Sequence, residues 1–143
     1  KVQKDRKMTL NIYGVGTDIV KNSRIKKLLK NKKFINRIFT SSEIKDSKKI
    51  KHKVLFFSKR FAAKEAFAKS LGTGFTHNIN FKDINISKKK SGKPYLTLSN
   101  NLKSILKRKL RLQKIKIFLS LSDEKEYSVA YVITQKIKWN KKF

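Results

Sequence analysis

The sequence predicts a single α+β domain in which a mostly antiparallel sheet packs against one long helix and several short helices. The long helix is indicated by the segment Lys53–Leu71, which is rich in Ala and Lys and contains no Gly or Pro. The sheet is indicated by four later segments in which apolar and polar residues alternate. A length of 143 residues suits one domain with a real core and is too short for two ordinary domains.

The first third of the chain predicts one strand and three short helices. Residues Leu10–Val15 have the composition of a short buried strand, and Gly16-Thr17-Asp18 is expected to close it with a tight turn. Apolar residues at three-to-four spacing then indicate an amphipathic helix over Ser23–Lys30 and a second helix over Phe34–Phe39. The run Thr40-Ser41-Ser42-Glu43 is typical of the start of a third helix, with acceptor side chains ahead of an acid.

The remainder predicts the long helix and then an antiparallel sheet. Phe57, Phe61, Ala68 and Leu71 mark one apolar face of the long helix, and Gly72 is its expected stop. The turn Ser91-Gly92-Lys93-Pro94 predicts a hairpin between two strands. The expected strands are Phe81–Ile86, Pro94–Ser99, Lys116–Ser122 and Tyr127–Gln135, with a basic helix around Leu102–Leu110.

The two ends of the chain are expected to lie outside the domain. Residues 1–9 form a basic N-terminal extension, residues 10–135 the domain, and residues 136–143 a lysine-rich, peripheral C-terminal tail. No apolar run approaches the roughly 18 to 20 residues that span a bilayer, so we expect a soluble protein without a membrane partner. A bacterial cytoplasm is one expected compartment. A plastid-like organelle such as an apicoplast is the other, suggested by AT-rich bias and a first residue that is not Met.

Composition limits the chemistry that the chain can perform. It has no Cys and only two His, so thiolate chemistry, disulfides and His-rich metal sites are excluded. Any metal must bind to oxygen atoms, which favours Mg²⁺ or a similar hard cation. The formal net charge of +29 predicts attraction to anions. Because the excess is mostly Lys beside many Asn and Ile, we attribute about half of it to an AT-rich genome.

Two acids stand out because the chain has only nine. Asp18 follows the first strand, where a backbone can aim a carboxylate into a cleft, and Glu65 lies within the long helix. Each also has a purely structural interpretation. Asp18 suits a turn, and Glu65 can form an i to i+4 ion pair with Lys69, worth about 0.3 to 0.5 kcal/mol.

Four blocks of the chain, together with Arg24, resemble in order and spacing those of the bacterial-type holo-(acyl-carrier-protein) synthases. Two core signatures of the wider phosphopantetheinyl transferase superfamily, G-x-D and K-E-x-x-x-K, match Gly16–Asp18 and Lys64–Lys69. The run RFAAKEAFAKSLGTG is the most specific, and the resemblance covers about Ile12 to Ile133. The blocks are YGVGTDIV at 13–20, FINRIFTSSE at 34–43, FFSKRFAAKEAFAKSLGTGF at 56–75 and SGKPYL at 91–96.

The resemblance implies transfer of 4′-phosphopantetheine from coenzyme A to a serine of an apo acyl carrier protein, supporting fatty acid biosynthesis. By the same resemblance, Asp18 and Glu65 hold one Mg²⁺ together with the coenzyme A pyrophosphate. Lys69 points at the diphosphate, and Lys64 is a second phosphate ligand or a support. The turn Gly72-Thr73-Gly74 allows close backbone approach to the nucleotide.

The family also implies a homotrimer with active sites between subunits. Gly92, Lys93 and Pro94 would then reach the nucleotide pocket from the neighbouring subunit, although these residues equally suit an ordinary hairpin turn. By the resemblance, Arg24 occupies the carrier-docking position with Arg37 as its companion, and arginine suits the carboxylates of an acidic carrier protein.

Two positions leave the chemistry open. The family has a histidine after S-x-[ST] near the last strands, whereas this chain has Asp123. An acid there repels phosphate, so Asp123 is not expected to bind coenzyme A. It instead shapes a helix cap or hairpin, lies near the attacking serine, or is a substitution without functional effect. The general base that takes the serine proton is a metal-bound water or an acid such as Glu43 or Asp46.

Two other classes of protein compete with the enzyme. A ribosomal or other RNA-binding protein is favoured by size and charge, but it does not explain why the scarce acids lie within GTDIV and RFAAKEAFAK. A membrane-surface module would use a basic amphipathic helix, which only residues 102–112 suggest. We therefore expect no specific nucleic-acid partner.

Overall fold

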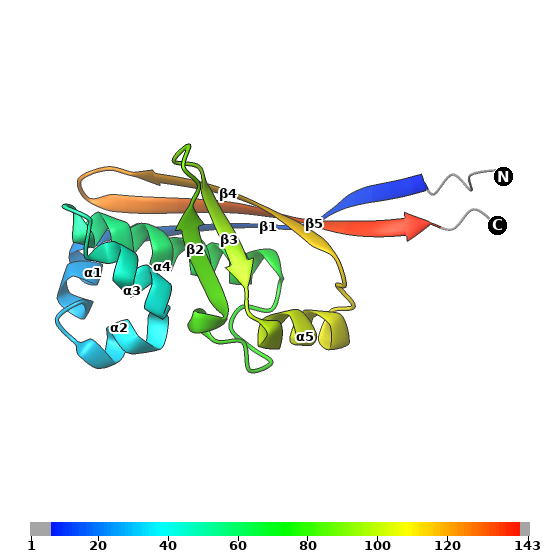
Figure 1. The fold of residues 1–143 in the computed structure, drawn as a ribbon, viewed down its shortest axis with the longest axis horizontal. Coiled ribbons are helices and arrows are strands. Elements are labelled where there is room, and N and C mark those ends of the chain that lie inside the picture. Colours follow the sequence, from blue (N-terminus) through cyan, green and yellow to red (C-terminus); the bar gives the residue numbers. More distant parts are fainter. Residues whose placement is uncertain (1–6, 141–143) are drawn as a thin grey trace.

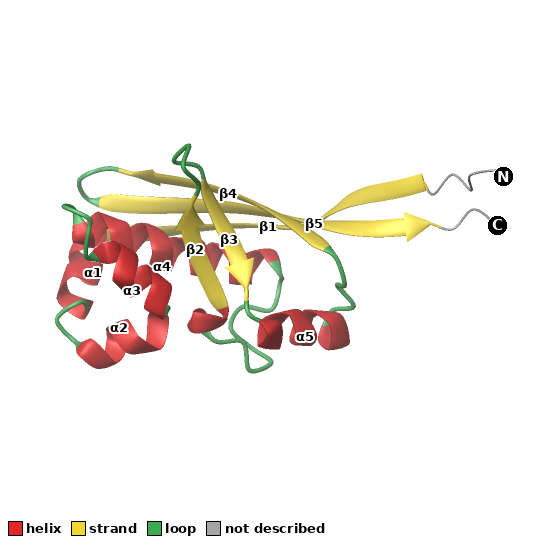
Figure 2. Cartoon of the chain, viewed as in Figure 1, coloured by secondary structure: helices red, strands yellow, loops and turns green. Residues whose placement is uncertain are grey.

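A computed structural model of the chain describes residues 7–140 and has the predicted α+β architecture (Figures 1 and 2). Every strand pair is antiparallel. No helix of the described residues is long and apolar enough to cross a membrane. In chain order the elements are β1 (Lys7–Lys21), α1 (Asn22–Leu28), α2 (Lys32–Ile38), α3 (Ser41–Ser47), α4 (Lys53–Ser70), a 3-10 turn (Phe81–Asp83), β2 (Ile84–Lys88), β3 (Pro94–Leu98), α5 (Asn100–Lys109), β4 (Ile115–Asp123) and β5 (Tyr127–Asn140).

The strands form two sheets around the long helix α4. One sheet has the order β1-β5-β4, and the other is the hairpin β2-β3. Helix α4 lies along one face of the larger sheet, and α1, α2 and α3 gather at one end of α4 (Figure 1). The predicted hairpin at 91–94 is confirmed, since Lys88 pairs with Pro94 and the Gly92 N–H donates to the Lys89 carbonyl at 2.8 Å.

Strand β1 is longer than predicted and has no turn at Gly16-Thr17-Asp18. These residues pair in register with Val132, Tyr131 and Ala130 of β5. Gly16 does not have a positive φ, so no turn geometry requires glycine there. A Cβ atom added to Gly16 would overlap the carbonyl oxygen of Ala66 in α4. The glycine is needed because the helix backbone lies directly against the strand.

The described parts of the two predicted extensions belong to the sheet. Strand β5 continues past the predicted boundary at Gln135, and Lys7 pairs with Asn140 at the far end. Residues 136–140 are therefore not a peripheral tail. β1 and β5 project beyond the helices as a two-stranded ribbon (Figure 1). The lysine-rich segment can form a strand there because its backbone N–H and C=O groups pair with those of β1. Residues 1–6 and 141–143 of the predicted extensions lie outside the described range.

Helix α4 is buried on almost every side rather than along one apolar face. Its middle packs between the large sheet and the short helices, so Ala62, Ala63 and Ala66 have no exposed surface. Small side chains allow this close packing on both sides. The helix ends as predicted, with Gly72 at a φ of 77°, a conformation that favours glycine. The predicted strand Phe81–Ile86 begins only at Ile84, because Asn80 and Asp83 cap a 3-10 turn ahead of it.

Candidate active site

The structure brings together the two acids singled out by the sequence. Asp18 is partly buried on β1, on the side of the strand that Gly16 and Val20 turn toward α4. Glu65 is partly buried on α4, next to Ala66, whose carbonyl lies against Gly16. Burial raises the pKa of Glu65, and the negative charge of Asp18 raises it further. A cation between two such neighbouring carboxylates would offset their repulsion.

Lys69 supplies a cation at this site. Its Nζ atom lies 3.1 Å from Asp18 Oδ1 and donates to the Thr17 carbonyl at 3.0 Å. The ammonium group is therefore anchored on β1 instead of forming the helix-surface ion pair with Glu65 that the spacing allowed. The Lys69 side chain is 54% exposed and that of Asp18 15% exposed, so the pair stands at a solvent-facing edge where a ligand can displace it.

Arg24 lies close enough to act electrostatically on the same site. It is exposed on α1, and its charge, with that of Lys69, opposes the rise in the pKa of Glu65. Arg37, its predicted companion, is exposed on α2. Both side chains are thus available to a partner.

Lys64 is not available to a phosphate. Its side chain has no exposed surface, and Nζ forms an ion pair with Glu43 Oε1 at 2.7 Å. The same ammonium donates to the carbonyls of Ile38, Phe81 and Ile84 at 2.8, 3.1 and 2.8 Å. Burial lowers the pKa of Lys64, and Glu43 opposes that shift. Of its two predicted roles, the phosphate ligand is contradicted, and the structure gives Lys64 a supporting role.

Glu43 is likewise a structural residue, which corrects its candidacy as the general base. It closes a capping box with Thr40 at the start of α3, as the sequence predicted. Its second oxygen accepts the Ile86 N–H at 2.9 Å. A carboxylate with no exposed surface and this set of partners cannot meet an incoming serine. Asp46, the other candidate, is exposed on α3.

Asp123 has a partner that the sequence did not reveal. Its Oδ2 atom lies 2.7 Å from Lys59 Nζ of α4, and both side chains are partly exposed. The acid that stands in the place of the family histidine therefore ties the end of β4 to the helix that carries Glu65. No sequence signal identified this pair, because Lys59 is one of many lysines.

The two glycine-containing turns adopt backbone conformations that suit glycine. Gly72 and Gly74 have φ values of 77° and 59°, and they follow the last turn of α4, just beyond Lys69. Gly92 has a φ of 88° at the exposed tip of the β2-β3 hairpin, beside exposed Lys93 and half-buried Pro94. The first turn is thus next to the acidic site along the chain, whereas the second comes from a separate hairpin.

Within residues 7–140 there is no group of three or more His, Asp or Glu side chains that could hold a metal ion. The carboxylates that the site offers to a metal are those of Asp18 and Glu65. Their oxygen atoms match the preference of Mg²⁺, which commonly binds one or two carboxylates and takes further oxygens from substrate phosphates and water.

We expect Gly16→Ala to damage the site through the backbone. The new methyl group must push β1 away from Ala66 and so move Asp18 relative to Glu65. Overpacking of this kind costs about 1–3 kcal/mol, and a displacement of about 1 Å can reduce turnover roughly 10²-fold. Urea unfolding and steady-state kinetics measure the two effects. Lys49→Ala, at an exposed position after α3, serves as the control. Unchanged turnover of Gly16→Ala would contradict the close-contact argument.

Helix α4 packs against a glycine-containing strand and brings two carboxylates and a lysine together, which are residue types that phosphoryl transfer uses. A sequence model of the 4′-phosphopantetheinyl transferase superfamily matches residues 14–132. The chain belongs to this superfamily. The match favours the enzyme over the RNA-binding and membrane-surface alternatives.

Within the superfamily, the similar proteins are holo-(acyl-carrier-protein) synthases. The holo-[acyl-carrier-protein] synthase of Pelagibacter ubique (strain HTCC1062) is 55% identical over 127 residues, which cover 89% of this chain and 99% of the relative. Two crystal structures of holo-(acyl-carrier-protein) synthases are also similar. The one from Neisseria meningitidis has 36% identity and a TM-score of 0.77, covering 87% of this chain and 98% of that chain. The one from Bacillus anthracis str. Ames, in complex with CoA (3′,5′-ADP), has 35% identity and a TM-score of 0.73. The match covers 87% of this chain and 97% of that chain.

Proposed function

We propose that the chain is a holo-[acyl-carrier-protein] synthase, which transfers 4′-phosphopantetheine from coenzyme A to a serine of apo acyl carrier protein. The observation that carries the proposal is the crossing of β1 and α4, where Asp18, Glu65 and Lys69 of the two superfamily signatures meet. The similarity to holo-[acyl-carrier-protein] synthases over nearly the whole length supports the same activity.

The reaction exchanges the phosphoanhydride bond of coenzyme A for a phosphate ester to serine. The serine oxygen forms a bond to the phosphorus on the pantetheine side of the diphosphate, and the bond from that phosphorus to the bridging oxygen breaks. Adenosine 3′,5′-bisphosphate leaves with the bridging oxygen, and the serine gives up its proton. Negative charge grows on the departing phosphate, so positive charge held at the site lowers the barrier.

We assign Asp18 and Glu65 as the protein ligands of one Mg²⁺. Both carboxylates come from rigid elements in backbone contact, and the raised pKa of Glu65 reflects burial and a neighbouring charge that a cation would offset. When bound, Mg²⁺ supplies positive charge to the diphosphate oxygens. The contact between Lys69 Nζ and Asp18 Oδ1 supports this assignment, because the Asp18 carboxylate already accepts a positively charged group.

Lys69 is assigned to the diphosphate. Its side chain is more than half exposed, so exchanging the Asp18 oxygen for a phosphate oxygen requires only rotation of the side chain. Lys64 has the opposite role. It joins α4 to the carbonyls of Ile38 and Ile84 and thereby positions the helix that carries Glu65 and Lys69. The backbone at Gly72-Thr73-Gly74, one turn further on, is the proposed contact for the nucleotide.

The test of the transfer is mass spectrometry of an apo carrier protein incubated with this protein, coenzyme A and Mg²⁺. We expect the carrier to gain the mass of one phosphopantetheine group. A carrier in which the acceptor serine is replaced by alanine is the control and should gain nothing. An unchanged mass for the apo carrier, with the enzyme folded and Mg²⁺ present, would overturn the proposed function.

We propose that the chain assembles as a homotrimer through the face of the large sheet that α4 does not cover. Alternate residues of the three strands point to this side, and several are large, apolar and well exposed. Val15 is 50% exposed, Ile19 64%, Tyr131 44% and Phe118 40%. Several large exposed apolar side chains on one sheet face usually mark an interface. In such an assembly Gly92, Lys93 and Pro94 are proposed to complete the nucleotide pocket of a neighbouring subunit.

Sedimentation velocity is expected to report a trimer for the unaltered chain. Placing charge on the apolar face with Val15→Glu and Tyr131→Glu should shift the protein toward the monomer, because a charge buried in an interface is costly. A control with glutamine at the exposed positions Lys49 and Lys51 lowers the charge by the same two units outside the face and should remain trimeric. An unaltered chain that is monomeric and fully active would contradict the shared active site.

We expect Arg24→Ala to raise the KM for the carrier protein with little change in the KM for coenzyme A. Arg24 is exposed on α1 near the acidic site, where it can meet carboxylates of an acidic carrier. The kinetics are measured near physiological ionic strength, where the Debye length is about 8 Å and the background of lysines is screened. Arg37→Ala tests the companion role, and Lys49→Ala is the exposed control. Equal weakening of both substrates would place Arg24 in the nucleotide pocket instead.

The compartment remains a prediction. The curated relative reported above comes from a bacterium, which agrees with the expected bacterial cytoplasm. The apicoplast alternative rested on AT-rich bias and the first residue alone, and nothing in the fold supports it.

A further inference from the structure

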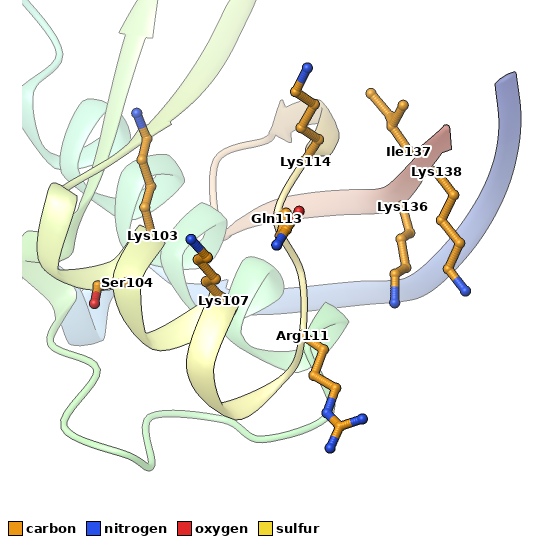
Figure 3. Close-up of a pocket in the computed structure, with 9 residues that line it drawn as sticks. All are labelled: Lys103, Ser104, Lys107, Arg111, Gln113, Lys114, Lys136, Ile137 and Lys138. Carbon is orange, nitrogen blue, oxygen red and sulfur yellow. The ribbon is translucent and has the colours of Figure 1, made fainter. Parts of the chain in front are cut away.

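A cleft separate from the candidate active site lies between helix α5 and the projecting end of β5 (Figure 3). It has a volume of about 930 Å³ and is lined by six cationic side chains and no acidic one. Lys103 and Lys107 stand one turn apart on α5, and Lys136 and Lys138 alternate on β5. Lys136 pairs with Asn11 and Ala130 with Asp18, so six residues of strand, about 20 Å, separate this cleft from the acidic site.

The cationic cleft opens into an apolar groove. The groove has a volume of about 500 Å³ and shares Lys103, Gln113, Lys114 and Ile137 with the cleft. Its apolar lining comes from three directions, with Leu98 on β3, Ile117 on β4 and Ile137 on β5. These side chains are only half-buried, so hydrocarbon remains accessible between the two sheets.

We propose that the joined cleft and groove bind an anionic amphiphile, a molecule with one alkyl or acyl chain and a phosphate head. Charge complementarity places the phosphate among the cations, and the hydrophobic effect places the chain against Leu98, Ile117 and Ile137. A nucleic acid would use the cations and leave the apolar lining in water. A neutral lipid would use the groove and make no use of the cations. The volume of the groove is in the range of small-molecule sites.

The test is isothermal titration calorimetry of the full chain with dodecyl phosphate, below its aggregation concentration and near physiological ionic strength. Inorganic phosphate represents the head alone, and dodecyl maltoside the chain alone. We expect dodecyl phosphate to bind at least about tenfold more tightly than either, because only it uses both halves of the site. Anionic vesicles and an oligonucleotide are titrated in parallel to examine a membrane or a nucleic acid as the partner.

Variants locate the binding. The double variant Lys107→Gln, Lys136→Gln should lower the affinity for dodecyl phosphate roughly tenfold, since two charge-assisted contacts are lost. Lys49→Gln with Lys51→Gln removes the same charge from an exposed segment after α3 and should change little. Ile137→Thr keeps the β-branched shape and should lower the affinity for dodecyl phosphate without changing the affinity for inorganic phosphate. Thermal melts establish that each variant is folded, and the two lysine pairs keep the test decisive if Ile137→Thr is unstable.

Four outcomes would overturn the proposal. Equal affinity for inorganic phosphate would leave a simple anion site, and equal weakening by the control lysine pair would mean non-specific attraction to a basic protein. Binding seen only with vesicles would assign the surface to membranes. Preference for the oligonucleotide, lost with Lys107→Gln and Lys136→Gln, would assign it to nucleic acid.

Discussion

Asp18→Ala and Glu65→Ala are each expected to reduce turnover on the order of 10²-fold or more while the protein remains folded. A site made of two carboxylates, substrate phosphate and water loses most of its Mg²⁺ affinity when one carboxylate is removed. Stability should change by no more than about 1 kcal/mol, because the Lys69–Asp18 pair is partly exposed and removing either acid relieves the repulsion between the two.

Magnesium titration tests whether the loss of turnover comes from weaker Mg²⁺ binding. Raising Mg²⁺ should partly rescue each single variant, and the double variant should be little worse than the singles because the two acids act as one unit. Calorimetry of Mg²⁺ binding in the presence of coenzyme A provides a readout that does not depend on turnover. Glu124→Ala removes an exposed carboxylate from the turn between β4 and β5 and serves as the control. Near-normal turnover of both single variants at limiting Mg²⁺ would mean that these acids are not the metal ligands.

The largest expected effect on stability is that of Lys64→Met. The change leaves Glu43 as an unpaired, fully buried carboxylate and removes the donor from three backbone carbonyls. Removing one partner of a buried ion pair costs about 3–5 kcal/mol. Urea unfolding should show this loss as a lower midpoint. Lys59→Met is the matched control on the same helix, and its partly exposed pair with Asp123 should contribute no more than about 1 kcal/mol.

A double variant shows whether the penalty comes from the unpaired charge. Glu43→Gln with Lys64→Met removes both charges and should be less destabilised than the sum of the two single variants. Kinetics separate this structural role from the phosphate-ligand role that the sequence suggested. A phosphate ligand at position 64 would raise the KM for coenzyme A and leave the unfolding midpoint nearly unchanged, and that result would contradict the assignment made here.

The sequence could determine the features that depend on neighbours along the chain. The long helix and its stop at Gly72 follow from helix propensity and from the left-handed conformation that glycine accepts. The capping box of Thr40 and Glu43 follows from their spacing. Asp18 and Glu65 stand out in the sequence because acids are scarce and because their motifs resemble those of a known family. Their proximity agrees with that expectation.

Tertiary structure decided the features that depend on distant residues. The sequence alone predicts a turn at Gly16, because a short run cannot reveal that a helix backbone lies against the strand. Lys64 and Lys69 share one motif, yet one is buried against Glu43 and the other reaches Asp18, 51 positions away in the chain. The lysine-rich run after Gln135 became a strand because β1 lies beside it. Local sequence expresses the preferences of a segment, whereas burial and pairing depend on the elements that folding places next to it.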